Sequence, residues 1–149
     1  MTEIRFYHLQ KTSQNQVLPV LLNKILERDH HVVIKLYNDT EKEQMNEHLW
    51  SFNPNSFLPH GSEKDGKAEM QPIWLTTKDE NPNKSDLLIL CQGVTSEMQG
   101  DFDICCEMLD GNNPEAVTAA RSRWKDYKEQ GFDVTYWQQT QSGGWEKAA

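Results

Sequence analysis

Apolar and polar residues occur in blocks along the chain, and their spacing predicts both strands and helices. The segment Glu3–Leu9 is rich in strand-forming residues and predicts the first strand. Apolar residues then recur at helical spacing and predict a helix that begins near Leu18, because Pro19 is tolerated only in the first turn of a helix. The nearly unbroken apolar run in His31–Tyr37 predicts a strand buried on both faces, which is typical of a parallel sheet.

A second helix is predicted from its capping residues. Thr40 followed three positions later by Glu43 matches a capping box, so we expect a helix over Glu41–Trp50. Two prolines and two asparagines in the next segment, Phe52–Gly61, prevent this helix from continuing. Together with the polar run Ser62–Gln71, the segment predicts a long loop, which in compact domains is either functional or mobile.

The remaining apolar blocks complete an alternation of strands and helices. Four blocks are short enough to be strands: Ile73–Leu75, Leu87–Cys91, Phe102–Leu109 and Val134–Trp137. Asn113 as N-cap, Pro114 at the first helical position and Gly131 just past the end delimit a helix over Pro114–Gln130. The alternation predicts an α/β fold with a mostly parallel sheet and helices on both faces.

The length of 149 residues corresponds to one domain, because domains usually span about 100–200 residues. We expect residues 1–137 to form this domain and residues 138–149 to be a flexible tail, since only Trp145 there suggests burial.

The charge of the chain limits its functions: with 15 basic and 23 acidic residues the net charge is −8, which argues against a protein that coats nucleic acid. The absence of a long apolar run and the three cysteines without a CxxC pair favour a cytoplasmic location without a membrane anchor.

We find no sequence motif for catalysis or for a cofactor. The run QKTSQNQ after the first strand offers no glycine for close approach to a phosphate, and neither GxGxxG nor GKS or GKT occurs. Cys105 and Cys106 are adjacent on a predicted strand, so their side chains point to opposite faces and are interpreted as buried, inert thiols. Asp101 and Asp103 lack a third metal ligand nearby. We therefore expect no catalytic residue, no metal and no cofactor.

The predicted helix Pro114–Gln130 carries the most informative surface pattern. At about 100° per residue, Arg121, Lys125 and Lys128 form a basic stripe beside the apolar face, and Trp124 lies on the border between the two. In an acidic chain, such a stripe can hold a carboxylate through Arg121 and an apolar side chain beside the indole, which suits an acidic peptide with an aromatic end. The alternative is the ordinary solvated flank of an amphipathic helix.

A second group of aromatic residues lies in the irregular segment LWSFNPNSFLPHG, which contains Trp50 and Phe57. Aromatic side chains in such a segment either cap the core or form an exposed apolar patch. An exposed patch of this kind indicates a surface for a protein partner.

Five segments in order resemble the chi subunit of bacterial DNA polymerase III: RFYHL, LWSFNPNSFLPHG, PIWL, DLLIL and ARSRWKDYKEQGFDV. The resemblance spans nearly the whole chain. It implies a three-layer, Rossmann-like α/β fold with a mostly parallel central sheet and no phosphate-binding loop. It also implies an adaptor without catalytic activity that is attached to the clamp loader during DNA replication.

The resemblance further implies partners and the residues that bind them. Chi proteins bind the psi subunit, which tethers them to the clamp loader, and separately bind the acidic C-terminal tail of single-stranded DNA-binding protein. A helicase-like protein could compete for the psi-facing surface, and no sequence-specific contact with nucleic acid is expected. The matching positions are Arg121, Trp124, Lys125 and Lys128 on the tail-binding helix, and Trp50 and Phe57 on the psi-facing surface.

An alternative from another functional class also fits the pattern of elements. A small nucleotide-binding protein or enzyme would have its site at the C-terminal edge of the sheet, where α/β folds usually bind ligands. Thermal stabilisation by a nucleotide, and not by an acidic peptide, would favour this alternative.

Overall fold

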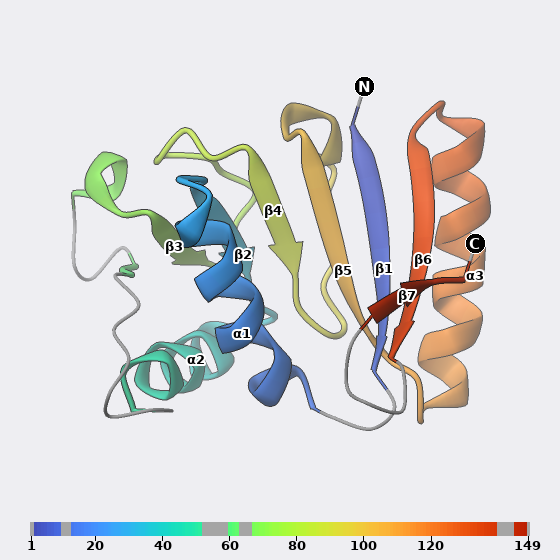
Figure 1. The fold of residues 1–149 in the computed structure, drawn as a ribbon, viewed down its shortest axis with the longest axis horizontal. Coiled ribbons are helices and arrows are strands. Elements are labelled where there is room, and N and C mark those ends of the chain that lie inside the picture. Colours follow the sequence, from blue (N-terminus) through green and yellow to red (C-terminus); the bar gives the residue numbers. More distant parts are fainter. Residues whose placement is uncertain (1, 10–12, 52–59, 63–66, 140–144, 149) are drawn as a thin grey trace.

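The computed structural model describes residues 2–9, 13–51, 60–62, 67–139 and 145–148, which form one sheet with helices around it (Figure 1). The described part of the sheet consists of β1 (Glu3–Leu9), β2 (Val32–Lys35), β3 (Ile73–Thr76), β4 (Leu87–Leu90), β5 (Ile104–Asp110), β6 (Asp133–Gln139) and β7 (Trp145–Lys147). The strand order is β3-β2-β4-β5-β1-β6-β7; β1 to β6 run parallel, and β7 runs antiparallel to β6. The predicted α/β fold with a mostly parallel sheet is confirmed.

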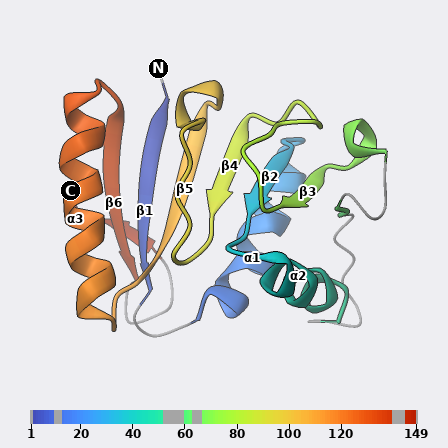
Figure 2. The same cartoon turned by 180° about the vertical axis from the view of Figure 1, so that it is seen from behind.

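The helices lie on both faces of this sheet. They are α1 (Gln14–Glu27), α2 (Asp39–Ser51) and α3 (Pro114–Glu129), with the short 3₁₀ turns η1 (Ala68–Met70) and η2 (Gln99–Asp101). α1 lies in front of the sheet in Figure 1, whereas α3 lies in front when the molecule is seen from behind in Figure 2. The chain crosses from β1 to β2 in one direction along the sheet and from β5 to β6 in the other, so right-handed crossovers place α1 and α3 on opposite faces. This arrangement gives the expected three layers.

The core follows from the alternation of side chains along the strands. Every residue of β3 and β4 is buried, as expected for strands inside a parallel sheet. On β1, Phe6 faces α3 and contacts the rings of Trp124 and Tyr127, whereas Arg5 and Tyr7 face the α1 side. The largest fully buried side chains are Phe6, Ile4, Leu9, Leu18, Leu22, Ile34, Leu36, Leu49, Ile73, Leu75 and Ile89.

α1 begins earlier than the apolar spacing predicts. Ser13 and Gln16 form a capping box, in which the Gln16 backbone N–H donates to the Ser13 hydroxyl and the Ser13 N–H donates to the Gln16 side chain. The helix therefore starts at Gln14, and the predicted start near Leu18 is wrong. The first turn of α1 is polar and carries no apolar pattern, but the capping box of Ser13 and Gln16 makes it helical.

Pro19 consequently lies in the second turn of α1, where a proline has no N–H to donate to the carbonyl group four residues before it. That carbonyl group belongs to Asn15. It instead accepts a hydrogen bond of 2.6 Å from Nε2 of His48, which comes from α2. A side chain of another helix thus satisfies the acceptor that the proline leaves unpaired.

The capping residue of α2 also differs from the prediction. The helix begins at Asp39, and Oδ1 of Asn38 accepts a hydrogen bond of 2.8 Å from the backbone N–H of Glu41. The predicted capping box of Thr40 and Glu43 is wrong, because Thr40 already lies inside the helix. The existence of the helix was predicted correctly, but the polar residues around its start allow more than one cap.

The boundaries of α3 agree with the sequence signals. The side chain of Asn113 accepts from the backbone N–H groups of Glu115 and Ala116, and Pro114 occupies the first helical position. Gly131 follows the helix with a φ of +92°, a conformation that favours glycine. Asn113, Pro114 and Gly131 predicted this helix because each acts on the backbone of its own end of the helix. None of the three depends on how the helix packs.

The C-terminal strands extend further than predicted. β6 continues to Gln139 instead of ending at Trp137, and Gln139 pairs with Trp145 of β7. β7 was not predicted, since its three residues are too few for a periodic signal. The flexibility of the segment 138–149 stays a prediction.

The predicted loop over Phe52–Gln71 lies largely outside the described residues. Within its described part, Gly61 forms a parallel bridge to Trp74. The N–H of Gly61 donates to Ile73, and the Gly61 carbonyl group accepts from Leu75. This short pairing covers the outer edge of β3.

Candidate functional site

The surface of α3 presents the basic stripe as the sequence predicts. Ala120 and Tyr127 are buried against the sheet. Arg121, Lys125 and Lys128 are exposed, and Trp124 is half-buried between the two sets; these four residues are named the α3 site below. The helix packs against β5 and β6, so the sheet determines which side of the helix faces solvent.

The indole ring of Trp124 is supported from below by two aromatic rings. Its centroid lies 5.9 Å from that of Phe6 on β1 and 6.1 Å from that of Tyr136 on β6. The ammonium group of Lys128 lies over the indole at 4.7 Å from its centroid, a cation–π contact. Helical spacing places Arg121 about one turn before Trp124 on α3. The ring is supported by Phe6 and Tyr136, and Lys128 lies over it.

A fourth basic residue of α3, Arg123, has a structural role. Its Nε lies 2.8 Å from Oε1 of Glu107 on β5, and the hydroxyl group of Tyr127 donates to the other carboxylate oxygen at 2.6 Å. Burial of Glu107, which is 2% exposed, raises the pKa of its carboxyl group, and the charge of Arg123 opposes that rise. This cluster anchors α3 on the sheet.

The basic residues of the α3 site are not neutralised in this way. Among the residues that the structure describes, no ion pair joins Arg121, Lys125 or Lys128 to an acidic group. Asp126 and Glu129, also on α3, are exposed and make no ion pair with them. The three cations are available to a ligand from solvent.

Two residues beneath the site were missed by the sequence analysis. Tyr136 contacts Trp124 and forms a hydrogen bond with Nδ1 of His8 on β1. Burial raises the pKa of Tyr136, and the charge of Arg121 opposes the rise, so the phenol lies within the electrostatic reach of that guanidinium group. The sequence held one signal for Tyr136: residues alternate between the two faces of a strand, so Tyr136 shares a face of β6 with the apolar Val134. Only the pairing of β6 with β1 shows that this face supports the α3 site.

The imidazole of His8 predicts a pH dependence of stability. His8 is 7% exposed, and no described group pairs with its Nε2 atom. Burial lowers the pKa of His8 below its ordinary value of 6.5, although Asp110 opposes the shift. The unfolded chain therefore binds the proton first as the pH falls, so the free energy of unfolding decreases as the pH falls below about 6.5.

We expect a His8→Leu variant to lose less unfolding free energy than the wild type when the pH is lowered from 7.5 to 5, as measured by urea unfolding. Parallel curves for the two proteins would contradict this prediction.

The second predicted surface lies at the other end of the sheet, because α2 packs against α1 and β3 (Figure 1). Trp50 is in the last turn of α2, and its side chain is 50% exposed. Its ring centroid lies 4.3 Å from that of His60, beyond the loop. Phe57, the second residue predicted there, lies outside the described residues. The exposed side chain of Trp50, with the His60 ring beside it, is named the Trp50 surface below. The structure places it away from the α3 site, at the other end of the sheet.

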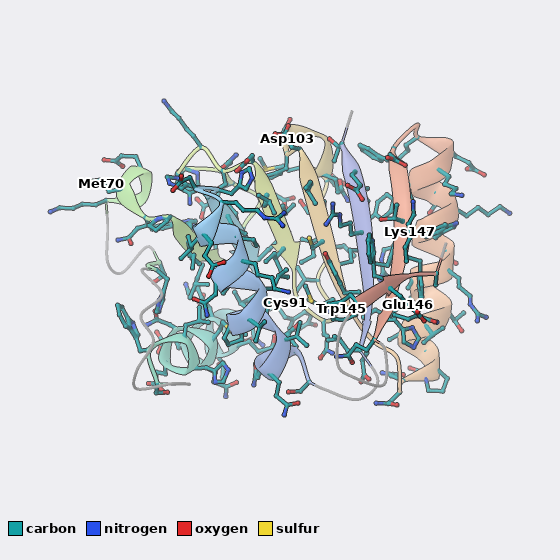
Figure 3. The ribbon with its side chains drawn as sticks, in the orientation of Figure 1. Met70, Cys91, Asp103, Trp145, Glu146 and Lys147 are labelled. Atoms are coloured by element: carbon teal, nitrogen blue, oxygen red, sulfur yellow. The ribbon has the colours of Figure 1, made fainter. Side chains whose placement is uncertain are left out.

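The cysteines on β5 are buried, and the described part of the chain holds no group of side chains arranged to bind a metal ion. Cys105 and Cys106 are buried, and burial raises the pKa of the Cys106 thiol to about 12. No three His, Cys, Asp or Glu side chains among the described residues are grouped closely enough to hold a metal ion. Asp101 ends η2 and Asp103 precedes β5 (Figure 3). Among the described helices, none is both long and apolar enough to cross a lipid bilayer.

Comparison with known proteins places the chain in one family. A family model described as DNA polymerase III chi subunit, HolC, matches residues 1–135. The DNA polymerase III subunit chi of Pseudomonas aeruginosa is 28% identical over 141 residues, which cover 90% of this chain and 94% of that protein. The subunit chi of Haemophilus influenzae is 26% identical over 107 residues, covering 70% and 72%. The probable subunit chi of Rickettsia prowazekii is 28% identical over 90 residues, covering 60% of this chain but only 54% of that protein.

The residues that match the family model include both candidate surfaces described above. The 135 matched residues run from β1 through α3 and into β6, so they include Trp50 and all four residues of the α3 site. Because this match covers most of the chain, the protein belongs to the DNA polymerase III chi subunit family.

Proposed function

We propose that this chi-family protein is a non-catalytic cytoplasmic adaptor with two protein partners. It binds the psi subunit of the clamp loader through the Trp50 surface, and it binds the acidic C-terminal tail of single-stranded DNA-binding protein through the α3 site. Membership of the family supports a role as an accessory subunit in DNA replication. The separation of the two surfaces supports simultaneous binding of both partners.

One observation carries the assignment of the α3 site. Three exposed cations without an ion pair in the described structure lie on the same helix as a half-buried indole, and one of them, Lys128, lies over its ring, on a protein whose net charge is −8. Arg123, the other basic residue of α3, differs from them because it is paired with the buried carboxylate of Glu107. Unpaired cations beside a fixed aromatic ring are suited to a ligand that brings both carboxylates and an apolar side chain.

Each residue of the α3 site has a distinct part in this proposal. Arg121 and Lys125 pair with the terminal carboxylate of the tail, and the planar guanidinium group of Arg121 can bind both oxygens. Trp124 contacts the last aromatic side chain on the part of its ring that Lys128 leaves open. Lys128 attracts the acidic residues that precede the end of the tail. Tyr136 holds the indole in position from below.

The central test is the Arg121→Ala variant. We expect it to weaken binding of an acidic peptide ending in Pro-Phe by roughly 10- to 100-fold, because a charged hydrogen bond contributes about 1.5–3 kcal/mol. Binding is measured by isothermal titration calorimetry, and raising the salt concentration should weaken the wild-type affinity as well. Lys78→Ala, which removes an exposed cation from the turn between β3 and β4, is the matched control. Equal affinities of wild type and Arg121→Ala would remove α3 from the mechanism.

The psi-facing surface is tested separately. We expect Phe57→Ala to weaken co-purification with psi, with a loss of affinity of about 30-fold if Phe57 is one of the aromatic residues that dominate the interface. The same variant should bind the acidic peptide normally, and Arg121→Ala should retain psi. Unchanged association of Phe57→Ala with psi would show that the assignment of this surface is wrong.

A further inference from the structure

A groove of about 390 Å³ lies on the α1 side of the sheet, opposite the face that carries α3. Its floor is formed by side chains of β1, β5 and β6, including Tyr7 and Trp137. α1 forms one wall, and Trp145 of β7 forms the other (Figure 3). The rings of Tyr7 and Trp145 meet edge to face with centroids 4.9 Å apart. The lining is mainly apolar, and the volume lies within the range of small-molecule sites, about 300–1,000 Å³.

The groove exists because α1 covers only part of this face. In Figures 1 and 2, α1 lies over the β2 and β4 side of the sheet, whereas the β1 and β6 side is crossed only by β7 within the described structure. Val20 of α1 lines the groove with 57% of its surface exposed. Trp137 and Trp145 are only half-buried. The described chain thus leaves concave apolar surface without a partner.

The ionisable nitrogen groups at the groove belong to Arg5, Lys24, Arg28 and His30. Among the described lining residues, none is Asp or Glu. Two of these basic side chains already have partners: Arg5 binds Glu3 and lies over the Trp137 ring, and His30 contacts Asp86.

Lys24, in the last turn of α1, and Arg28, the C-cap residue of that helix, make no ion pair with any described residue. They are one turn apart on the same side of the helix, and both are exposed. In a protein of net charge −8, two cations without an ion pair to any described residue, at the rim of an apolar groove, are complementary to an anion with an apolar body.

We propose that this groove, named here the α1 groove, binds a small organic anion. The ligand has one carboxylate, which pairs with Lys24 and Arg28, and an apolar body the size of one or two aromatic rings, which packs against Tyr7, Trp137 and Trp145. A small ligand is favoured over a peptide because the groove is concave and short, and because its polar groups converge at one rim. The inference does not depend on the function proposed for the α3 site.

The test compares two probes of equal shape on the full chain: 2-naphthylacetate, which is charged, and 2-naphthylacetamide, which is neutral. Binding is followed by NMR through the indole N–H signals of the tryptophans. We expect 2-naphthylacetate to shift the signals of Trp137 and Trp145 and to leave those of Trp50 and Trp124 unchanged. The amide should bind at the same place about fivefold more weakly, because it lacks the charge that pairs with the rim.

A charge-reversal variant tests the rim directly. Lys24→Glu/Arg28→Glu should weaken 2-naphthylacetate about tenfold and leave the amide unaffected. Lys67→Glu/Lys78→Glu changes the net charge equally at two exposed lysines that do not line the groove and should bind both probes as the wild type does. Equal affinity for acid and amide, or shifts at Trp124 in place of Trp137 and Trp145, would overturn the proposal. Displacement of 2-naphthylacetate by the acidic peptide would identify a peptide as the occupant and would also overturn it.

Discussion

Replacing Glu107 by alanine is expected to lower the free energy of unfolding by about 3 kcal/mol, as measured by urea denaturation. The substitution removes the partner of the Arg123 guanidinium group and of the Tyr127 hydroxyl group, both on α3. Breaking a buried ion pair typically costs about 3–5 kcal/mol. The low end applies here because the side chain of Arg123 keeps 28% of its surface exposed and can regain water.

The control is Glu129→Ala, which removes an exposed carboxylate from the same helix and should change the unfolding free energy by less than about 0.5 kcal/mol. A loss for Glu107→Ala no larger than this would mean that the buried cluster does not anchor α3.

The pH dependence of Glu107→Gln gives a second readout of the same cluster. Burial raises the folded-state pKa of Glu107, so the folded protein holds this proton more tightly than the unfolded chain does. The unfolding free energy of the wild type should therefore fall, relative to the glutamine variant, as the pH rises through 4.5 toward the raised folded pKa. Above that folded pKa the difference should stay constant. The opposite slope would indicate that Arg123, and not burial, dominates the environment of this carboxylate.

The Phe6→Ala variant should show the second large effect, because Phe6 is fully buried and contacts Trp124, Tyr127 and Tyr136. Removing a buried phenylalanine side chain costs about 3–5 kcal/mol of unfolding free energy. The cavity would lie directly beneath the indole ring of the α3 site. We therefore expect the acidic peptide to bind several-fold more weakly to Phe6→Ala, measured by calorimetry where the variant is still folded.

A matched core variant separates the loss of stability from the loss of peptide affinity. Leu75 is also fully buried, but on β3 at the other end of the sheet. Leu75→Ala should lose about 2–5 kcal/mol of stability and bind the peptide with wild-type affinity. If both variants weakened the peptide equally, the loss would reflect general destabilisation instead of the support that Phe6 gives to Trp124.

Several features of this fold could be predicted because their signals are local. β1 and α3 agree with the prediction, since a strand is indicated by its composition and α3 by Asn113, Pro114 and Gly131. The start of α1 could not be placed from its apolar residues. Pro19 lies inside the helix, and the Asn15 carbonyl group that it leaves unpaired accepts a hydrogen bond from His48, which is distant in sequence.

The candidate site was predicted in part for the same reason. Helical spacing alone places Arg121, Lys125 and Lys128 on the exposed side of α3 and Trp124 at its border. Spacing does not show that Arg123 is paired, because the contact of Arg123 with Glu107 depends on where α3 packs on the sheet. Tyr136 and His8 come from strands 128 residues apart in sequence, so their contact beneath the indole could not be predicted.

The sequence by itself determined the alternation of strands and helices, the resemblance to the chi family and the stripe of basic residues on α3. These depend on residue order and on periodicities within single elements. Only the tertiary structure decided which cations are paired and which are free, what supports Trp124, and that the α1 side of the sheet retains an open groove. The physical reason is that each of these features arises between elements, where the strand order of the sheet brings distant side chains into contact.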